Sequence, residues 1–108
     1  MEIIYREKNK EIFLQRWQEY IDNNLNCVRY ILLYVEYFLL YAENLILDKS
    51  FIIIENNKAV GICFCPIEKT NNISTISISG GYVMAPLSIN KRIQKKIFEE
   101  VELISKDF

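Results

Sequence analysis

The hydrophobic and polar residues near the start of the chain alternate with the period of a helix. Five apolar residues of segment 10–23 follow one another at spacings of one, four, three and one, which places them on one helix face: Ile12, Phe13, Trp17, Tyr20 and Ile21. The Asp- and Asn-rich segment 22–26 favours a turn, because these side chains hydrogen-bond to nearby backbone. The pattern predicts a first helix over residues 10–23 and a second one that follows the turn.

A seven-residue repeat, RYILLYV followed by EYFLLYA, marks the predicted second helix, residues 27–45. Seven residues advance a helix by almost two turns, so Arg29, Glu36 and Glu43 fall on one narrow polar stripe. The rest of the helix surface is apolar or tyrosine. Such a helix needs cover on most of its circumference.

Three interpretations of this helix differ in what provides the cover. A membrane span needs about 20 consecutive apolar residues, whereas Glu36 divides the apolar residues into two short runs. A coiled coil has a narrow apolar seam flanked by charges, and the apolar surface here is wider than that. We therefore favour a core helix that packs against a sheet on one side and another helix on the other, and we predict no membrane partner.

Two runs of β-branched and aromatic residues predict a β-hairpin in the middle of the chain. The runs FIIIE (residues 51–55) and AVGICFC (residues 59–65) are joined by Asn56 and Asn57, which tolerate the left-handed backbone of a tight turn. We expect Pro66 to end the second strand.

The segment after the hairpin predicts further strands. We expect residues 68–72 to form a polar connection, followed by a strand over residues 73–79, where Ile alternates with Ser and Thr. Gly80 and Gly81 end this strand, and residues 82–85 are compatible with a short fourth strand.

A third helix is predicted at the C-terminal end of the sequence, with Ser88 or Asn90 as its N-cap. Its apolar stripe consists of Ile89, Ile93, Ile97, Val101 and Ile104. The predicted fold class is α+β: two N-terminal helices, an antiparallel sheet of three to four strands and a C-terminal helix. With 108 residues, we expect a single small domain, residues 1–108.

Composition narrows the chemistry that this chain can perform. The net charge of -1 and the 25% of charged residues do not indicate a nucleic-acid partner. The absence of histidine excludes a histidine general base and a Ser-His or Cys-His pair. The odd number of cysteines and a charged start that lacks the apolar core of a secretion signal predict a cytoplasmic location.

The cysteines favour burial over a metal site. Cys63 and Cys65 lie two apart on a predicted strand, so their side chains share one face of it. A metal would need two further ligands, and Cys27 is the one remaining cysteine. We therefore predict structural cysteines and no metal.

The order of the predicted elements, together with three segments, resembles a known family. The segments are DKSFIIIENNKAVGICFCP, ISTISISGGYVMAPLS and INKRIQKKIFEEVELIS. From Ile12 onward they are similar to the N-terminal half of a Gcn5-related N-acetyltransferase domain, above all to its FemAB-like branch. The resemblance implies a partial acyl-CoA N-acyltransferase-like fold and transfer of an acyl or aminoacyl group to an amine. It also implies that the backbone of Gly80 and Gly81 and the side chain of Tyr82 face the substrate.

The sequence departs from this family at the cofactor site. Family members bind the pyrophosphate of acetyl-CoA with a Gln/Arg-x-x-Gly-x-Gly/Ala loop, which Gly61, Gly80 and Gly81 do not form. The family's domains are also longer. We therefore expect a truncated member that binds no cofactor and does not catalyse by itself. Acetyl-CoA or an aminoacyl donor would bind if a missing C-terminal half, acting as a partner, completed the domain.

An alternative function comes from the predicted helix 27–45. Its wide apolar surface suits a non-catalytic interaction module that forms a homodimer or binds another partner through this helix. A third interpretation, a membrane-associated protein, is less favoured because Glu36 interrupts the apolar run.

Overall fold

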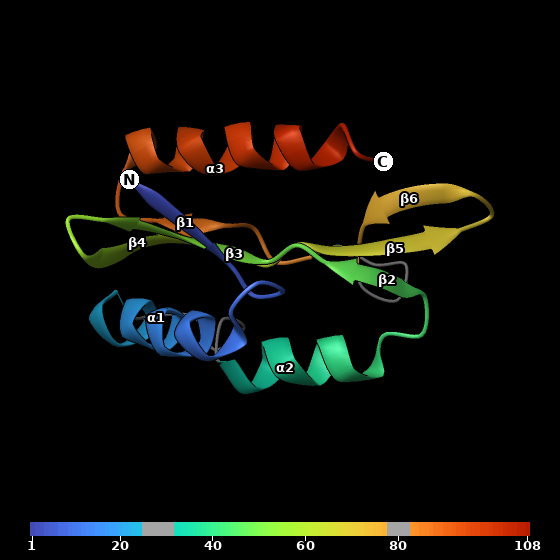
Figure 1. The fold of residues 1–108 in the computed structure, drawn as a ribbon, viewed down its shortest axis with the longest axis horizontal. Coiled ribbons are helices and arrows are strands. Elements are labelled where there is room, and N and C mark those ends of the chain that lie inside the picture. The colour runs from blue at the N-terminus through green and yellow to red at the C-terminus, as the bar shows by residue number, and fades with distance from the viewer. Residues whose placement is uncertain (25–31, 78–82) are drawn as a thin grey trace.

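Strands form the middle layer of the molecule and helices cover both of its sides (Figure 1). The computed structural model describes residues 1–24, 32–77 and 83–108. The described elements are, in chain order, β1 (Glu2–Tyr5), α1 (Lys10–Asn23), α2 (Leu32–Tyr41), β2 (Leu45–Asp48), β3 (Phe51–Glu55), β4 (Lys58–Cys63), β5 (Pro66–Thr70), β6 (Ile73–Ile76), β7 (Leu87–Ser88) and α3 (Lys91–Ser105). The predicted α+β class is confirmed, and so are the bounds of the first helix.

The strands belong to two antiparallel sheets. One has the order β1-β3-β4-β7 and the other the order β2-β5-β6. Ser50 lies fully buried where the chain passes from β2 to β3: its Oγ accepts the N–H of Cys65 at 2.9 Å, and its carbonyl accepts the N–H of Arg6 at 3.0 Å. Lys49 N–H also donates to Cys65 O, at 2.8 Å. These bonds join the sheets at their common boundary.

The central strand β3 is apolar on both faces because both faces are covered. Ile52 and Ile54 belong to the core that α1 and α2 cover, whereas Phe51 and Ile53 belong to the core beneath α3. Figure 1 shows α3 on one side of the strand layer and α1 and α2 on the other. The unbroken apolar run of β3 therefore reflects its central position.

A register shift in the β3–β4 pairing lets α3 approach the sheet closely. Ile53 pairs with Gly61 and Ile54 with Ala59, which leaves one extra residue on β4. A Cβ at Gly61 would lie 2.9 Å from Ile93 Cγ2 and 3.0 Å from Ile97 Cδ1. Both isoleucines are fully buried, so the missing side chain of Gly61 is the space that α3 fills.

The second helix is shorter than the sequence predicts. It ends at Tyr41, not at Leu45, and Leu45 begins β2. The helix ends early because the following residues pair with β5 instead. This pairing of β2 with β5 includes a hydrogen bond of 3.2 Å from Lys69 N–H to Asn44 O. The predicted start of this helix, residues 27–31, lies outside the described residues.

The structure has two sheets where one was predicted, because Pro66 begins a strand instead of ending one. Residues 68–72 are not a connection: β5 and β6 form a second hairpin, closed by Asn71 and Asn72 at φ of 52° and 66°. The first hairpin turn uses Asn56 and Asn57 in the same left-handed conformation. The Asn-Asn turn signal in the sequence thus occurs at both hairpins.

Strand predictions at the chain's ends also need correction. No strand was predicted at residues 2–5, but β1 forms there, ahead of α1 and α2, and pairs with β3. Val83 to Ala85 form no strand, and β7 lies at Leu87–Ser88, whereas Tyr82 is outside the described residues. Helix α3 agrees with the prediction and takes Asn90, not Ser88, as its N-cap.

We expect Gly61→Val to lower the free energy of unfolding by about 1–3 kcal/mol, because the new side chain overlaps Ile93 and Ile97 and forces α3 away from β4. Urea denaturation measures the change. Adding Ile97→Val removes the Cδ1 atom of the second contact and should recover part of the loss. If the two substitutions are additive instead, Gly61 does not set the distance between α3 and the sheet.

Candidate functional site

Helix α2 presents a row of large apolar side chains on its outer surface. Val35 and Leu39 are buried against the sheet. Tyr37, Leu40 and Tyr41 are 55%, 75% and 63% exposed, and the rings of the two tyrosines lie 4.8 Å apart between centroids. We call these three residues the α2 face. Leu40 lies on the side opposite these buried contacts. The predicted core helix is therefore packed against the core on one side, and its α2 face is exposed to solvent.

A groove of about 530 Å³ runs beside the α2 face. Its walls come from the turn after β1, from the start of α1, from α2 and from β2. The lining residues are Arg6, Lys10, Glu36, Tyr37, Leu39, Leu40, Tyr41, Leu45 and Asp48. The groove thus combines the apolar residues of α2 with a cluster of charges.

Arg6 is the centre of that charged cluster. Its Nε and Nη2 donate to the two carboxylate oxygens of Glu36 at 3.0 and 2.5 Å, and its Nη1 donates to Asp48 Oδ2 at 3.0 Å. The Arg6 side chain is only 16% exposed. Burial lowers the pKa of Arg6, but hydrogen bonds and charge from Glu36 and Asp48 outweigh burial and raise this pKa above its usual value.

The Arg6 cluster is structural, since its charges are matched. Lys10 Nζ lies 3.8 Å from Glu36, so two cations face two carboxylates. The sequence predicted a narrow polar stripe through Arg29, Glu36 and Glu43. Glu36 is ion-paired, Glu43 lies beyond the end of α2, and Arg29 lies outside the described residues. Sequence reasoning missed Arg6 and Asp48, because they are 30 and 12 residues from Glu36 along the chain.

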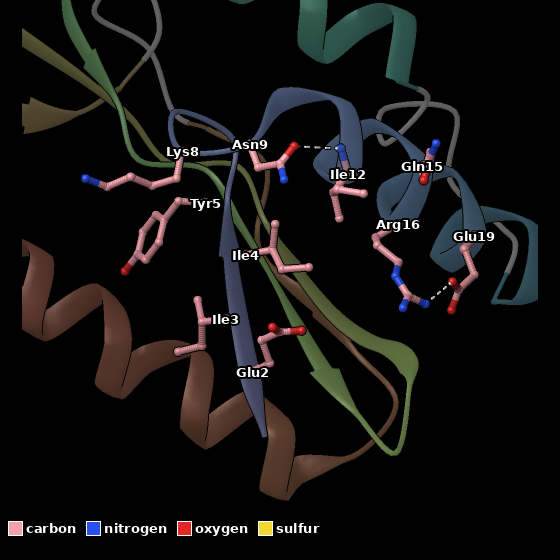
Figure 2. A pocket seen from close by; sticks show the side chains of 10 residues that line it. All are labelled: Glu2, Ile3, Ile4, Tyr5, Lys8, Asn9, Ile12, Gln15, Arg16 and Glu19. Carbon is pink, nitrogen blue, oxygen red and sulfur yellow. Dashed lines mark hydrogen bonds and ion pairs between the residues drawn. The ribbon is translucent and has the colours of Figure 1, made fainter.

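A second groove, of about 600 Å³, lies between β1 and α1 (Figure 2). One of its walls is held by Arg16 and Glu19 of α1. Arg16 donates to Glu19 at 2.7 Å and to the side chain of Asn57 at 2.7 Å, and Glu19 accepts the N–H of Ala59 at 2.8 Å. The bond from Ala59 is the main reason that the pKa of Glu19 lies below its usual value. These bonds fix α1 to the β3–β4 hairpin.

The two cysteines that the structure describes are buried, as predicted. Cys63 and Cys65 are free thiols in the core beneath α3. The hydrogen bond with Cys65 and burial raise the pKa of Cys63, which keeps this thiol protonated and unreactive at neutral pH. Cys27 lies outside the described residues. Among the residues that are described, no group of three or more His, Cys, Asp or Glu side chains is placed to hold a metal ion.

A buried carboxylate lies in β5, where the sequence predicted a polar connection. Glu68 is 2% exposed and accepts a hydrogen bond of 2.6 Å from Ser77 Oγ, which lies 2.8 Å from Thr75 Oγ1. Buried glutamates are rare. No sequence signal distinguished Glu68 from a glutamate in an exposed loop.

The residues predicted to face a substrate, Gly80, Gly81 and Tyr82, lie outside the described residues, so their role stays a prediction. None of the helices formed by the described residues has the length and apolar character that crossing a membrane requires. Comparisons with protein-family models, with curated proteins and with solved structures found no match to this chain. The grooves and the α2 face are therefore the basis for inferring function.

We expect Arg6→Met to lower the free energy of unfolding by about 2 kcal/mol, because Glu36 and Asp48 lose the cation that compensates for their partial burial. Lys10→Met is the matched control. It removes a cation from the same cluster, but its side chain is 60% exposed, so the loss should stay below about 0.5 kcal/mol. Chemical denaturation compares the two variants, and equal stabilities would rule out an anchoring role for Arg6.

Proposed function

We propose that this chain is a non-catalytic interaction module that forms a homodimer through α2. The observation that carries the proposal is the α2 face, whose residues are each more than half exposed. Exposed aromatic and aliphatic side chains that lie together are typical of protein interaction sites, whereas scattered ones are not. The tyrosine hydroxyls can remain hydrated at the rim while their rings are buried.

The charges around the α2 face favour a second copy as the partner. Lys10 lies beside Glu36 near one end of the face, and the exposed Glu43 lies beyond the other end. A two-fold axis near Leu40 would place α2 antiparallel to its copy, with Lys10 of each chain near Glu43 of the other. An isologous interface needs such self-complementary charges.

The required contact is larger than three side chains. A stable dimer buries about 800 Å² on each partner. We therefore expect the interface to include the walls of the neighbouring groove, where Leu45 adds apolar surface. The Arg6 cluster would then hold α2 in a fixed orientation for docking.

We expect Leu40→Glu to convert a dimer into a monomer, because it places a carboxylate at the centre of the apolar contact. Sedimentation velocity at about 0.1 mM protein measures the change, since even a weak dimer is populated at that concentration. Leu103→Glu is the matched control: it adds the same charge at an exposed leucine of α3 and should leave the dimer intact. A monomeric wild-type chain would contradict the proposal.

An acyltransferase-like function is a second candidate, and the order of elements supports it. Helices α1 and α2 precede the hairpins and α3 follows them, as the resemblance implies. The sequence at the start of α3 lacks the pyrophosphate loop of that family, however, and this favours the interaction module. Asn90 Oδ1 accepts the N–H of Ile93 at 2.9 Å, as in an ordinary helix N-cap.

We expect no rise in melting temperature when about 1 mM acetyl-CoA is added to the chain, because a ligand stabilises only the protein that it binds. Differential scanning fluorimetry is sufficient for the measurement, with inorganic pyrophosphate as the control for a non-specific anion effect. A rise with acetyl-CoA that pyrophosphate does not reproduce would favour the enzyme over the interaction module.

A further inference from the structure

The outer edge of β1 has no partner strand among the described residues. β1 is the terminal strand of its sheet and pairs with β3. We propose that this edge binds an extended peptide segment of another protein, which adds antiparallel to β1 as a further strand of the sheet. The site is separate from the α2 face and does not depend on the proposed homodimer.

The direction of the β1 backbone groups follows from its pairing with β3. Arg6 N–H donates to Ser50 O at 3.0 Å, so this N–H points toward β3. Backbone groups alternate in direction along a strand, so the N–H and C=O of Ile4, which lies opposite Ile52, also point toward β3. The N–H and C=O of Ile3 and the N–H of Tyr5 therefore point to the open edge.

An extended backbone is the ligand that matches these groups. Tyr5 O accepts the N–H groups of Lys8 and Asn9, both at 3.1 Å, so it is already bonded within the turn. The remaining donors, on Ile3 and Tyr5, lie two residues apart, which is about 6.8 Å along a strand. An antiparallel peptide presents its own carbonyl and N–H groups at this spacing.

The groove beside β1 gives the peptide a binding surface for its side chains. Figure 2 shows β1 alongside α1, with Ile4 on the strand and Ile12 and Arg16 on the helix. The bonds of Arg16 and Glu19 to the β3–β4 hairpin hold this helical wall in position. Ile4 and Ile12 favour a β-branched peptide side chain, threonine or valine, between them.

Two charges at opposite ends of the groove define the rest of the peptide's chemistry. Glu2 and Lys8 line the groove, and neither forms an ion pair within the described part of the chain. An antiparallel peptide starts near Lys8 and ends near Glu2. We therefore infer a peptide with an acidic residue toward its N-terminus, a basic residue toward its C-terminus and β-branched residues between them.

A second copy of β1 fits the groove less well. Two-fold pairing in the hydrogen-bonded register around Ile3 places Glu2 of one chain opposite Ile4 of the other. In that arrangement neither Glu2 nor Lys8 gains an opposite charge. The register around Tyr5 would place Glu2 opposite Lys8, but it needs the Tyr5 carbonyl, which already accepts the N–H groups of Lys8 and Asn9. A peptide of the stated charge pattern places an opposite charge near Glu2 and near Lys8.

The test uses the capped peptide DVTVTVK and, as its control of identical composition, KVTVTVD. In an NMR titration of the whole chain, we expect DVTVTVK to shift the amide signals of Ile3 and Tyr5 and to slow their hydrogen exchange by roughly tenfold or more. The amide of Ile4, which already bonds to β3, should change less. The control peptide should bind more weakly, because both of its charges face like charges.

Proline at position 3 separates edge pairing from loss of the Ile3 side chain. Ile3→Pro removes the outward N–H without breaking the β1–β3 ladder, because proline is tolerated where a strand's N–H faces outward. Ile3→Ala removes the same apolar side chain but keeps the donor. We expect Ile3→Pro to weaken peptide binding by roughly tenfold or more relative to Ile3→Ala.

Several results would overturn the proposal. These are no binding of DVTVTVK to the wild-type chain at about 1 mM, equal binding by both position-3 variants, or exchange protection at Ile3 that rises with protein concentration in the absence of peptide. If Ile3→Pro does not fold, DVTVTVK N-methylated at the residues that face β1 gives the same test with the wild-type chain, and undiminished binding of that peptide would contradict edge pairing. Leu40→Glu should leave peptide binding unchanged, which distinguishes this site from the dimer.

Discussion

Burial of the β3–β4 hairpin on both faces is the constraint on which the other elements depend. A strand that is apolar on each side exposes hydrophobic surface until two separate layers cover it. Helices α1 and α2 supply one layer and α3 the other (Figure 1). Both layers are also fixed at the hairpin's turn: Arg16 of α1 bonds to Asn57, and Arg92 of α3 bonds to Glu55 at 2.5 and 2.9 Å. The hairpin thus sets the positions of the helices.

The covering layer beneath the hairpin is uneven, and this explains the open surface of α2. Helix α1 has polar residues on its outer side and buries Phe13, Trp17 and Tyr20. Helix α2 is apolar on both sides, and its outer side stays exposed after Val35 and Leu39 have packed. A helix of this kind has no preferred inner face from hydrophobicity alone. The ion pair of Glu36 with Arg6 supplies the missing orientation, since a partly buried charge that loses its partner is costly.

Local sequence patterns predicted most helices and strands, whereas pairing between distant strands determined where several of them begin and end. The first hairpin and α3 followed from Asn56-Asn57 and from a regular apolar stripe. The equivalent turn at Asn71-Asn72 was missed because Pro66 was interpreted as a terminator, although proline is allowed at the first residue of a strand. Four-residue β1 becomes a strand through its pairing with β3, about 50 residues away, which no local pattern indicates.

The candidate sites were harder to predict than the fold for the same reason. Arg6, Glu36 and Asp48 come from three separate segments, and only Glu36, a single charge within an apolar run, stood out in the sequence. Glu68 gave no signal, because its burial results from the β5–β6 hairpin. The Gly80-Gly81-Tyr82 hypothesis concerns residues that the structure does not describe. Sequence reasoning therefore identified the wide apolar surface of α2 but not that one side of it is exposed, nor the contacts of Arg6 and Asp48 that orient the helix.

The described sheet edges differ in how well they are protected against pairing. β7 is only two residues long, and β2 contains an irregularity between Leu45 and Leu47, both of which discourage an incoming strand. β1 and β6 are regular four-residue edges, and of these β1 lies beside a helix-walled groove. That wall exists because Glu19 bonds to Ala59 at the hairpin. The hydrogen bond between Ala59 and Glu19, which fixes α1 to the hairpin, therefore also shapes the groove beside the open edge of β1.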